Sequence, residues 1–233
     1  MGGVIKMAIF LTGDCHADFR KIYNFADRME LNENDYIIVL GDMGLFWRND
    51  RKDADVFIRD FEERCNFNLY FVDGNHENFK ILNSLPIDEN GMGHISDHIK
   101  HLRRGCRYNI DGKDILAVGG ADSVDKFRRV EGLSWWREEE ITSKEIEAIA
   151  AGHYDYVLSH SCPLSIFEEN KVYLCTLGNI VDDNDEEFKK TNIQLENLLQ
   201  KIDFNHWYFG HYHVDLHLDD KFTCLLNAFV ELK

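Results

Sequence analysis

The sequence contains few prolines, no long apolar run and a deficit of basic residues. It has two prolines among 233 residues, and no apolar stretch approaches the roughly 18 residues that a membrane-spanning helix needs. The apolar run in the opening MGGVIKMAIFLTGD is too short for a signal peptide. Lys and Arg number 26 against 42 Asp and Glu, a formal net charge of −16. Because long nucleic acids are bound through clustered basic side chains, this balance argues against a protein that coats them.

Closely spaced cysteine pairs are also missing. The six cysteines are scattered and form no CxxC motif, so free thiols in a reducing cytoplasm are the simplest interpretation. Apolar residues make up 44% of the chain and aromatic residues 12%, which is typical of a folded protein rather than a disordered one. We therefore expect residues 1–233 to form a single domain of a cytoplasmic protein that has no membrane partner.

Five short apolar runs each end in a turn that carries Asp, Asn or His. Runs of this length, rich in β-branched and aromatic residues, are typical of buried strands. Four of the five place Gly just before the polar residue, and Gly allows a sharp exit and close backbone approach. The runs are IFLTG before Asp14, YIIVLG before Asp42, LYFVDG before Asn75, YDYVLS before His160 and HWYFG before His211.

Helical and hairpin patterns separate these runs. Apolar residues at three- and four-residue spacing predict helices over 18–31 and 51–65, and the pair Thr142 and Glu145 is a capping box that opens a helix over 142–151. A further amphipathic helix is predicted over 186–202. Strands and helices therefore alternate early in the chain, as in α/β folds.

Later segments favour antiparallel pairing. Hairpins are predicted over 106–120, around Asp111-Gly112, and over 214–230, around Asp219-Asp220. Residues 120–137 and 161–190 are predicted to be loop-like insertions.

The polar residues that follow the strands are expected to meet at one edge of the fold. In open α/β sheets, the crevice beyond the strand ends is the usual site. Two carboxylates, several imidazoles and an amide suit first-row divalent metals, and the absence of thiolate pairs argues against a structural Cys-type zinc site. The residues gathered there would be Asp14, His16, Asp42, Asn75, His76, His160, His211 and His213.

The same residues, in the same order, resemble the motifs of the calcineurin-like metallophosphoesterases. The motifs span nearly the whole chain and read Gly13-Asp14-Cys15-His16, Gly41-Asp42, Gly74-Asn75-His76-Glu77, His160 and Gly210-His211-Tyr212-His213. The resemblance implies an α/β fold, a four-layer α/β/β/α sandwich with two mixed β-sheets. Two departures occur: Ala17 stands where the family usually has Gly, and the second motif lacks the Arg-Gly of the protein-phosphatase branch. The second departure weakens a direct assignment to that branch.

The resemblance also implies a role for each residue. Asp14, His16 and His213 resemble the ligands of the first metal, and Asn75, His160 and His211 those of the second. Asp42 resembles the carboxylate that bridges the two. His76 resembles the histidine that contacts the ester or leaving oxygen, where it would act as an imidazolium. Glu77 occupies the place of a residue that orients a histidine from behind.

This set implies a binuclear, metal-dependent phosphoric ester hydrolase. In such centres two divalent ions roughly 3.5–4 Å apart bind a bridging hydroxide, which attacks phosphorus in line. We expect manganese, with iron, zinc and cobalt as alternatives, because mixed nitrogen and oxygen ligands permit all four.

The expected substrate is a phosphomonoester, either a phosphoprotein or a nucleotide. The first alternative is a phosphodiesterase acting on cyclic nucleotides, dinucleotides or nucleic-acid ends. A remote alternative is a metal-free interaction module on the same fold. The sequence leaves the oligomeric state open.

Basic side chains outside the ligand motifs are candidates for substrate contacts. Arg48 follows the second motif, and Arg128 and Arg129 lie in VGGADSVDKFRRVEGLSWWREEE. That stretch resembles one in compact bacterial and phage members of the family. Guanidinium groups there could clamp a substrate phosphate, although surface ion pairing with Glu131 or with residues 138–140 explains Arg128 and Arg129 equally well.

Overall fold

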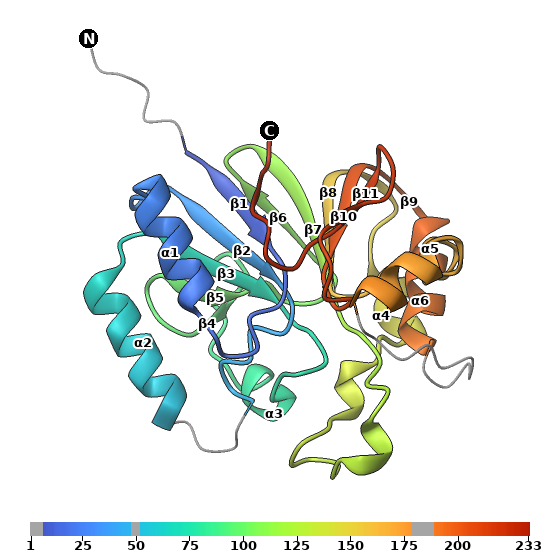
Figure 1. Ribbon diagram of the computed structural model, residues 1–233, viewed down its shortest axis with the longest axis horizontal. Coiled ribbons are helices and arrows are strands. Elements are labelled where there is room, and N and C mark those ends of the chain that lie inside the picture. Colours follow the sequence, from blue (N-terminus) through green and yellow to red (C-terminus); the bar gives the residue numbers. More distant parts are fainter. Residues whose placement is uncertain (1–6, 48–51, 179–188) are drawn as a thin grey trace.

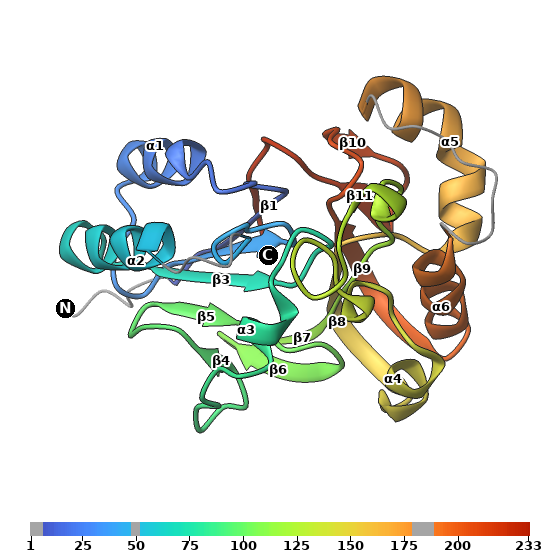
Figure 2. The ribbon, with the colours of Figure 1, turned by 90° about the horizontal axis from the view of Figure 1, so that it is seen from below.

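A computed structural model describes residues 7–47, 52–178 and 189–233 and shows two facing β-sheets with helices on their outer sides (Figure 1). Each sheet has six strands and mixes parallel with antiparallel pairs. Seen from below, the layers run from helices through the two sheets to helices again (Figure 2). The four-layer sandwich expected from the sequence is therefore confirmed.

The first sheet has parallel strands at its centre and antiparallel strands at its edges. The parallel strands are β1 (Ile9–Thr12), β2 (Tyr36–Leu40), β3 (Asn68–Val72) and β5 (Ile99–His101). The edges are β12 (Val230–Glu231), beside β1, and β4 (Gly93–His94), beside β5. Helices α1 (Arg20–Met29) and α2 (Lys52–Arg64) cover its outer face, and the short α3 (Phe79–Leu82) follows β3.

The second sheet repeats this plan. Its parallel strands are β7 (Lys113–Gly119), β8 (Gly152–Ser159), β9 (Ile202–Phe209) and β11 (Phe222–Cys224). Its antiparallel edges are β6 (Cys106–Ile110) and β10 (Leu216–His217), so both predicted hairpins are confirmed. Helices α4 (Ser143–Ala148), α5 (Leu164–Gly178) and α6 (Lys190–Leu199) lie on its outer side (Figure 2).

The central strands bury side chains on both faces. In β2, Ile38 and Leu40 belong to the core between the sheets, whereas Ile37 and Val39 belong to the core beneath the helices of the first sheet. A strand buried on both faces has no polar side to alternate with. This is why the five runs are mostly apolar and do not alternate with polar residues.

One predicted insertion is wrong. Residues 161–190 contain α5, which was missed because its apolar residues do not fall on one face: Leu174 is buried, but Val172, Tyr173 and Leu177 are exposed. Residues 179–188 of that insertion, and with them the start of the predicted helix over 186–202, lie outside the described residues. Residues 120–137 are irregular apart from a 3₁₀ turn, Lys126–Arg128, an isolated bridge between Glu131 and Trp135, and the start of a second turn, Arg137–Glu139.

Other local expectations agree with the structure. Thr142 and Glu145 form the capping box at the start of α4, and none of the six cysteines, all of which are described, forms a disulfide. Every helix in the described part of the chain is too short or too polar to cross a membrane.

A buried ion pair anchors the turn that follows β3. The Asp73 carboxylate accepts hydrogen bonds from the Arg104 guanidinium, with Nε at 3.2 Å, and lies 3.3 Å from His101 Nε2. Its backbone carbonyl accepts the Gly120 N–H at 2.9 Å and so ties the first sheet to the second. Burial opposes its charge, but Arg104 lowers the pKa of Asp73 to about 2.

Arg104→Met should destabilise the fold by about 3–5 kcal/mol at neutral pH, because it leaves a buried carboxylate without its partner. Arg107→Met is the matched control: the Arg107–Asp114 pair is exposed to solvent, so its loss should change stability far less. Since the fold lowers the Asp73 pKa, its contribution is present above about pH 4 and is lost as the pH falls toward 2. Urea unfolding across this range should show the gap between wild type and Arg104→Met closing. Equal losses of unfolding free energy in both variants would contradict the anchoring role of the Asp73–Arg104 pair.

Candidate metal centre

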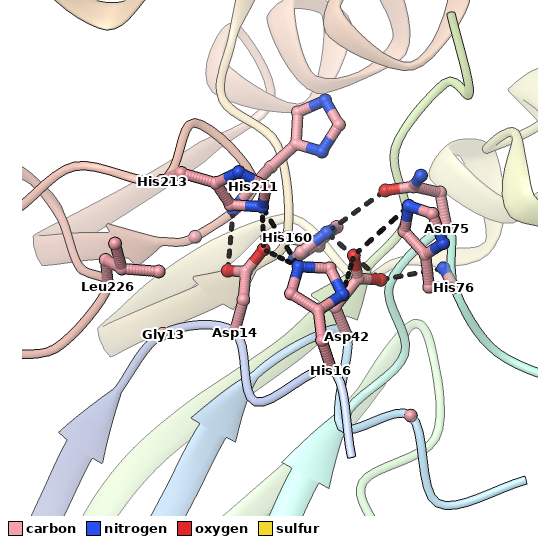
Figure 3. A network of polar contacts seen from close by, with 12 residues as sticks. Gly13, Asp14, His16, Asp42, Asn75, His76, His160, His211, His213 and Leu226 are labelled. Atoms are coloured by element: carbon pink, nitrogen blue, oxygen red, sulfur yellow. Dashed lines mark hydrogen bonds and ion pairs between the residues drawn. The ribbon is translucent and has the colours of Figure 1, made fainter. Parts of the chain in front are cut away.

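The turns beyond β1, β2, β3, β8 and β9 bring the predicted ligands together at one rim (Figure 3). Several of these residues have left-handed backbones, with φ of 48° at His16, 48° at Asp42, 68° at His211 and 52° at His213. Such conformations are uncommon for residues other than glycine and cost about 1–3 kcal/mol each. They persist where the surroundings impose them, and they cluster at functional sites.

Glycines precede several of the candidate ligands because a ligand from another turn fills the space that a side chain would need. A Cβ on Gly74 would lie 2.1 Å from Asp42 Oδ1, and one on Gly41 would lie 2.2 Å from His160 Nδ1. No side chain tolerates such approaches. The Gly-polar pattern in the sequence therefore reflects crowding among the ligands.

Asp14 is buried and holds one unsatisfied oxygen. Its Oδ1 accepts the His211 N–H at 3.0 Å. Its Oδ2 lies 3.2 Å from His213 Nε2 and 3.5 Å from His16 Nε2, yet it accepts no hydrogen bond. Burial opposes its charge, but His160 and the neighbouring imidazoles hold the Asp14 pKa well below its usual value. A buried, charged and unsatisfied oxygen is what a cation ligand requires.

Asp42 lies at the centre of the rim. Its Oδ1 accepts the His76 N–H at 2.7 Å and lies 3.3 Å from His160 Nε2, while its Oδ2 lies 3.7 Å from His16 Nδ1. Its backbone carbonyl accepts the N–H groups of Cys15 and His16 at 3.0 and 2.8 Å. Burial opposes its charge, but His160 lowers the Asp42 pKa. The residue thus joins the turns after β1 and β3.

His160 presents one ring nitrogen to the centre. Its Nδ1 donates to the Leu40 carbonyl at 2.7 Å, and its Nε2 lies 3.2 Å from Asn75 Oδ1. A bond at Nδ1 leaves Nε2 as the ligand nitrogen of a neutral ring. Burial disfavours its protonation, but Asp42 and Asp14 raise the His160 pKa to about 10. The carboxylates therefore attract positive charge, and a divalent cation would compete with this proton.

Asn75 is oriented by two residues from the 120–140 segment. Its Nδ2 donates to Ser123 Oγ at 3.1 Å, and Ser123 Oγ donates to Glu139 Oε2 at 2.5 Å. Glu139 is fully buried, and burial raises its pKa to about 8. This chain of donors fixes the amide so that its oxygen, the better metal ligand, faces His160.

His76 lies between the centre and an aromatic wall. Its Nε2 is 3.9 Å from Asp42 Oδ2, and its ring stacks on Trp47 with centroids 4.0 Å apart. Arg129 Nη2 lies 3.3 Å from His76 Nε2. Burial and the Arg129 charge outweigh Asp42 and lower the His76 pKa to about 4. This environment disfavours the imidazolium expected from the sequence, which is a correction.

Two other predicted site residues, His211 and Arg128, form no side-chain hydrogen bond with Asp14 or Asp42 in the described structure. The His211 ring packs edge-on to the rings of His160 and Tyr212, at 5.0 Å from each, and only its backbone N–H contacts Asp14. Arg128 is exposed, with its guanidinium over Phe127. Arg48 lies outside the described residues.

Glu77 is fully buried but does not orient a histidine. Its Oε1 accepts the Gly44 N–H at 3.3 Å, so it supports the loop after Asp42 instead. Burial raises the Glu77 pKa well above its usual value. The expectation that Glu77 orients a histidine is wrong, because its carboxylate bonds to the backbone of that loop and not to an imidazole.

Lys21 is a site residue that the sequence analysis missed. From α1 its Nζ donates to the carbonyls of Gly13, Asp14 and Leu226, at 2.8, 2.8 and 2.5 Å. It joins the turn that carries Asp14 to the C-terminal segment. Ser123, Glu139 and Trp47 were missed as well, because none belongs to a recognisable motif and each acts through a contact distant in sequence.

Within residues 7–47, 52–178 and 189–233, three groups of side chains are spaced to hold a metal ion. Within each, the ligand atoms lie within 4.8 Å of one another: Asp14 with His16 and His213, His16 with Asp42 and His76, and Asp14 with Asp42 and His160. The first group is the set predicted for the first metal. The groups share members, so they form one centre. Its carboxylates and imidazoles fit first-row divalent cations.

Residues 7–215 match the family model of the calcineurin-like phosphoesterases. A search of curated proteins finds no match. The matched region contains every residue of the three groups.

Ser123→Ala should weaken the binding of the ion that the sequence analysis assigns to Asn75. Without the Ser123 hydroxyl, the Asn75 amide can turn its NH₂ toward the centre, and loss of such a supporting contact typically costs about 10–100-fold in metal affinity. Calorimetric titration with Mn²⁺ should show one binding step weakened and the other, at Asp14, His16 and His213, unchanged. Ser165→Ala, which removes a serine bonded to Glu196, is the control. Two unaltered steps in Ser123→Ala would refute the orienting role.

Proposed function

Because this chain belongs to the calcineurin-like phosphoesterase family, we propose that it is a metal-dependent phosphomonoesterase, which transfers a phosphoryl group from an ester to water. The family and the overlapping ligand groups support a metal-dependent phosphoester hydrolase. The choice of a monoester is ours, and it depends on Arg129.

The proposed ligand set is the one that the sequence indicates. Asp14, His16 and His213 would hold one divalent cation, Asn75, His160 and His211 would hold a second, and Asp42 would be shared. We favour manganese. Bound there, the cations would neutralise the phosphate and lower the pKa of water to about 7. Asp14 and Asp42 attract them, and Ser123 keeps the Asn75 oxygen turned toward them.

The position of Arg129 favours a phosphomonoester as the substrate. Its Nη1 is buried and has no hydrogen-bond partner, and its Nη2 lies beside His76 at 3.3 Å. The same Nη2 pairs with Asp125 Oδ1 at 2.7 Å, which holds the guanidinium in place. A monoester carries one more negative charge than a diester, so it gains more from a fixed cation with an unused donor. Arg129 would bind a phosphate oxygen while His76 contacts the ester oxygen.

Hydrolysis of p-nitrophenyl phosphate and bis-p-nitrophenyl phosphate tests this function. Full-length protein, stripped of metal and reloaded with Mn²⁺, should hydrolyse the monoester. His76→Ala should lower kcat at least about a hundredfold, while calorimetry shows that Mn²⁺ still binds.

Other results of these assays would support a different function. Hydrolysis of the diester alone would make the protein a phosphodiesterase. Inactivity with manganese, iron, zinc and cobalt would favour a non-catalytic module. Loss of Mn²⁺ binding in His76→Ala would make His76 a metal ligand.

Arg129→Met should raise KM for p-nitrophenyl phosphate about tenfold or more, because it removes a charge-assisted hydrogen bond to the phosphate. Arg128→Met removes a neighbouring, exposed guanidinium and should leave KM unchanged. Steady-state kinetics of the two variants at the same Mn²⁺ concentration provide the comparison. Equal effects would mean that general surface charge, and not the Arg129 position, binds the substrate.

A further inference from the structure

A cavity of about 780 Å³ opens beside the metal centre, between α1, α2 and the loop after β2. His16 and His76 line this cavity and also belong to the candidate ligand groups. The cavity is therefore continuous with the centre. Its volume lies within the range of about 300–1,000 Å³ that is typical of small-molecule sites, and the proposed chemistry at the rim leaves it without a role.

The walls of the cavity are aromatic. They include Phe19, Tyr23, Trp47 and Phe57. Phe19 and Phe57 stack with centroids 3.8 Å apart, and the Tyr23 ring meets Phe57 edge-on at 6.3 Å. Trp47 stacks on His76, so an aromatic surface begins where the ester oxygen is expected to lie. Flat ring systems bind well against such walls.

Hydrogen-bond acceptors are placed along the same cavity. Asp53 and Asp60, both from α2, line it. Asp60 accepts a hydrogen bond from the Tyr23 hydroxyl at 3.1 Å and pairs with Arg64 at 3.2 Å. These partners hold the Asp60 carboxylate at the wall, where it can accept a further hydrogen bond. Carboxylates suit hydroxyl or amino groups of a ligand and disfavour additional phosphates.

We propose that this cavity, which we call the aromatic pocket, binds the nucleoside half of a nucleoside monophosphate. This inference rests on the proposed function, since the phosphate would lie at the metal centre beside Arg129. The base stacks on the aromatic walls, and its amino group or the ribose hydroxyls donate to Asp53 or Asp60. The pocket is roomy for a nucleoside, whereas a single phenyl ring would fill little of it.

Two matched variants isolate the aromatic pocket. Phe57→Ala removes a partly buried ring that lines it. Phe229→Ala removes another partly buried ring, which stacks on Phe25 with centroids also 3.8 Å apart but lies outside the pocket. Both rings pack against the same core, so the losses in stability should be similar. Phe57→Leu retains most of the apolar volume without the aromatic face, and replaces Phe57→Ala if that variant fails to fold.

Adenosine is the probe for binding, because it carries no phosphate and cannot be hydrolysed. Calorimetry with the Mn²⁺-loaded full chain should show saturable binding that Phe57→Ala weakens at least about tenfold and Phe229→Ala leaves unchanged. In parallel, the ratio of kcat/KM for adenosine 5′-monophosphate to that for glycerol 2-phosphate should fall about tenfold in Phe57→Ala. Taking a ratio removes any general effect on the metal centre.

The outcomes separate this inference from the proposed function. Hydrolysis of glycerol 2-phosphate without adenosine binding would overturn the nucleoside pocket and leave the phosphatase standing. Adenosine binding that depends on Phe57, in a protein that hydrolyses no ester, would support the pocket and overturn the function. A higher kcat/KM for a phosphotyrosine peptide than for adenosine 5′-monophosphate would also overturn the nucleoside assignment.

Discussion

Asp14 and Asp42 are buried among histidines, and the geometry of the rim depends on these two carboxylates. Burial disfavours their charge, and the imidazoles around them balance it, as divalent cations would. Each carboxylate also holds a neighbouring turn: Asp14 accepts the backbone N–H of His211, and Asp42 accepts that of His76. The charges that suit a cation therefore also position the turns from which the other candidate ligands project.

The centre exists only when the two sheets are packed together. The first sheet provides Asp14, Asp42 and Asn75, and the second provides His160 and His211 (Figure 3). The hydrogen bond from His160 Nδ1 to the Leu40 carbonyl crosses between them at 2.7 Å. The glycines before the ligands permit this approach. Assembly of the ligand set therefore requires the packed sandwich.

The surroundings of the centre are asymmetric. The 120–140 segment supplies Ser123 and Arg129 from irregular backbone and Glu139 from the turn Arg137–Glu139. The aromatic pocket, formed by α1, α2 and the loop after β2, borders the centre at His16 and His76. Trp47 connects the two, because it stacks on His76 and lies beneath the Arg129 guanidinium. A phosphate ester bound there would have its charged and organic ends in different environments.

The sequence by itself determined the strands that carry the site and most of the residues at their ends. Both signals are local: a strand buried on two faces is a continuous apolar run, and a crowded strand end needs Gly before its polar residue. Helix α5 escaped prediction because its apolar residues are not confined to one face. Only the tertiary structure distinguished Arg129 from Arg128, moved Glu77 from a histidine to a loop, brought Lys21 beneath Asp14 and opened the aromatic pocket. Burial and contacts between distant segments decide these features, and no local pattern encodes them.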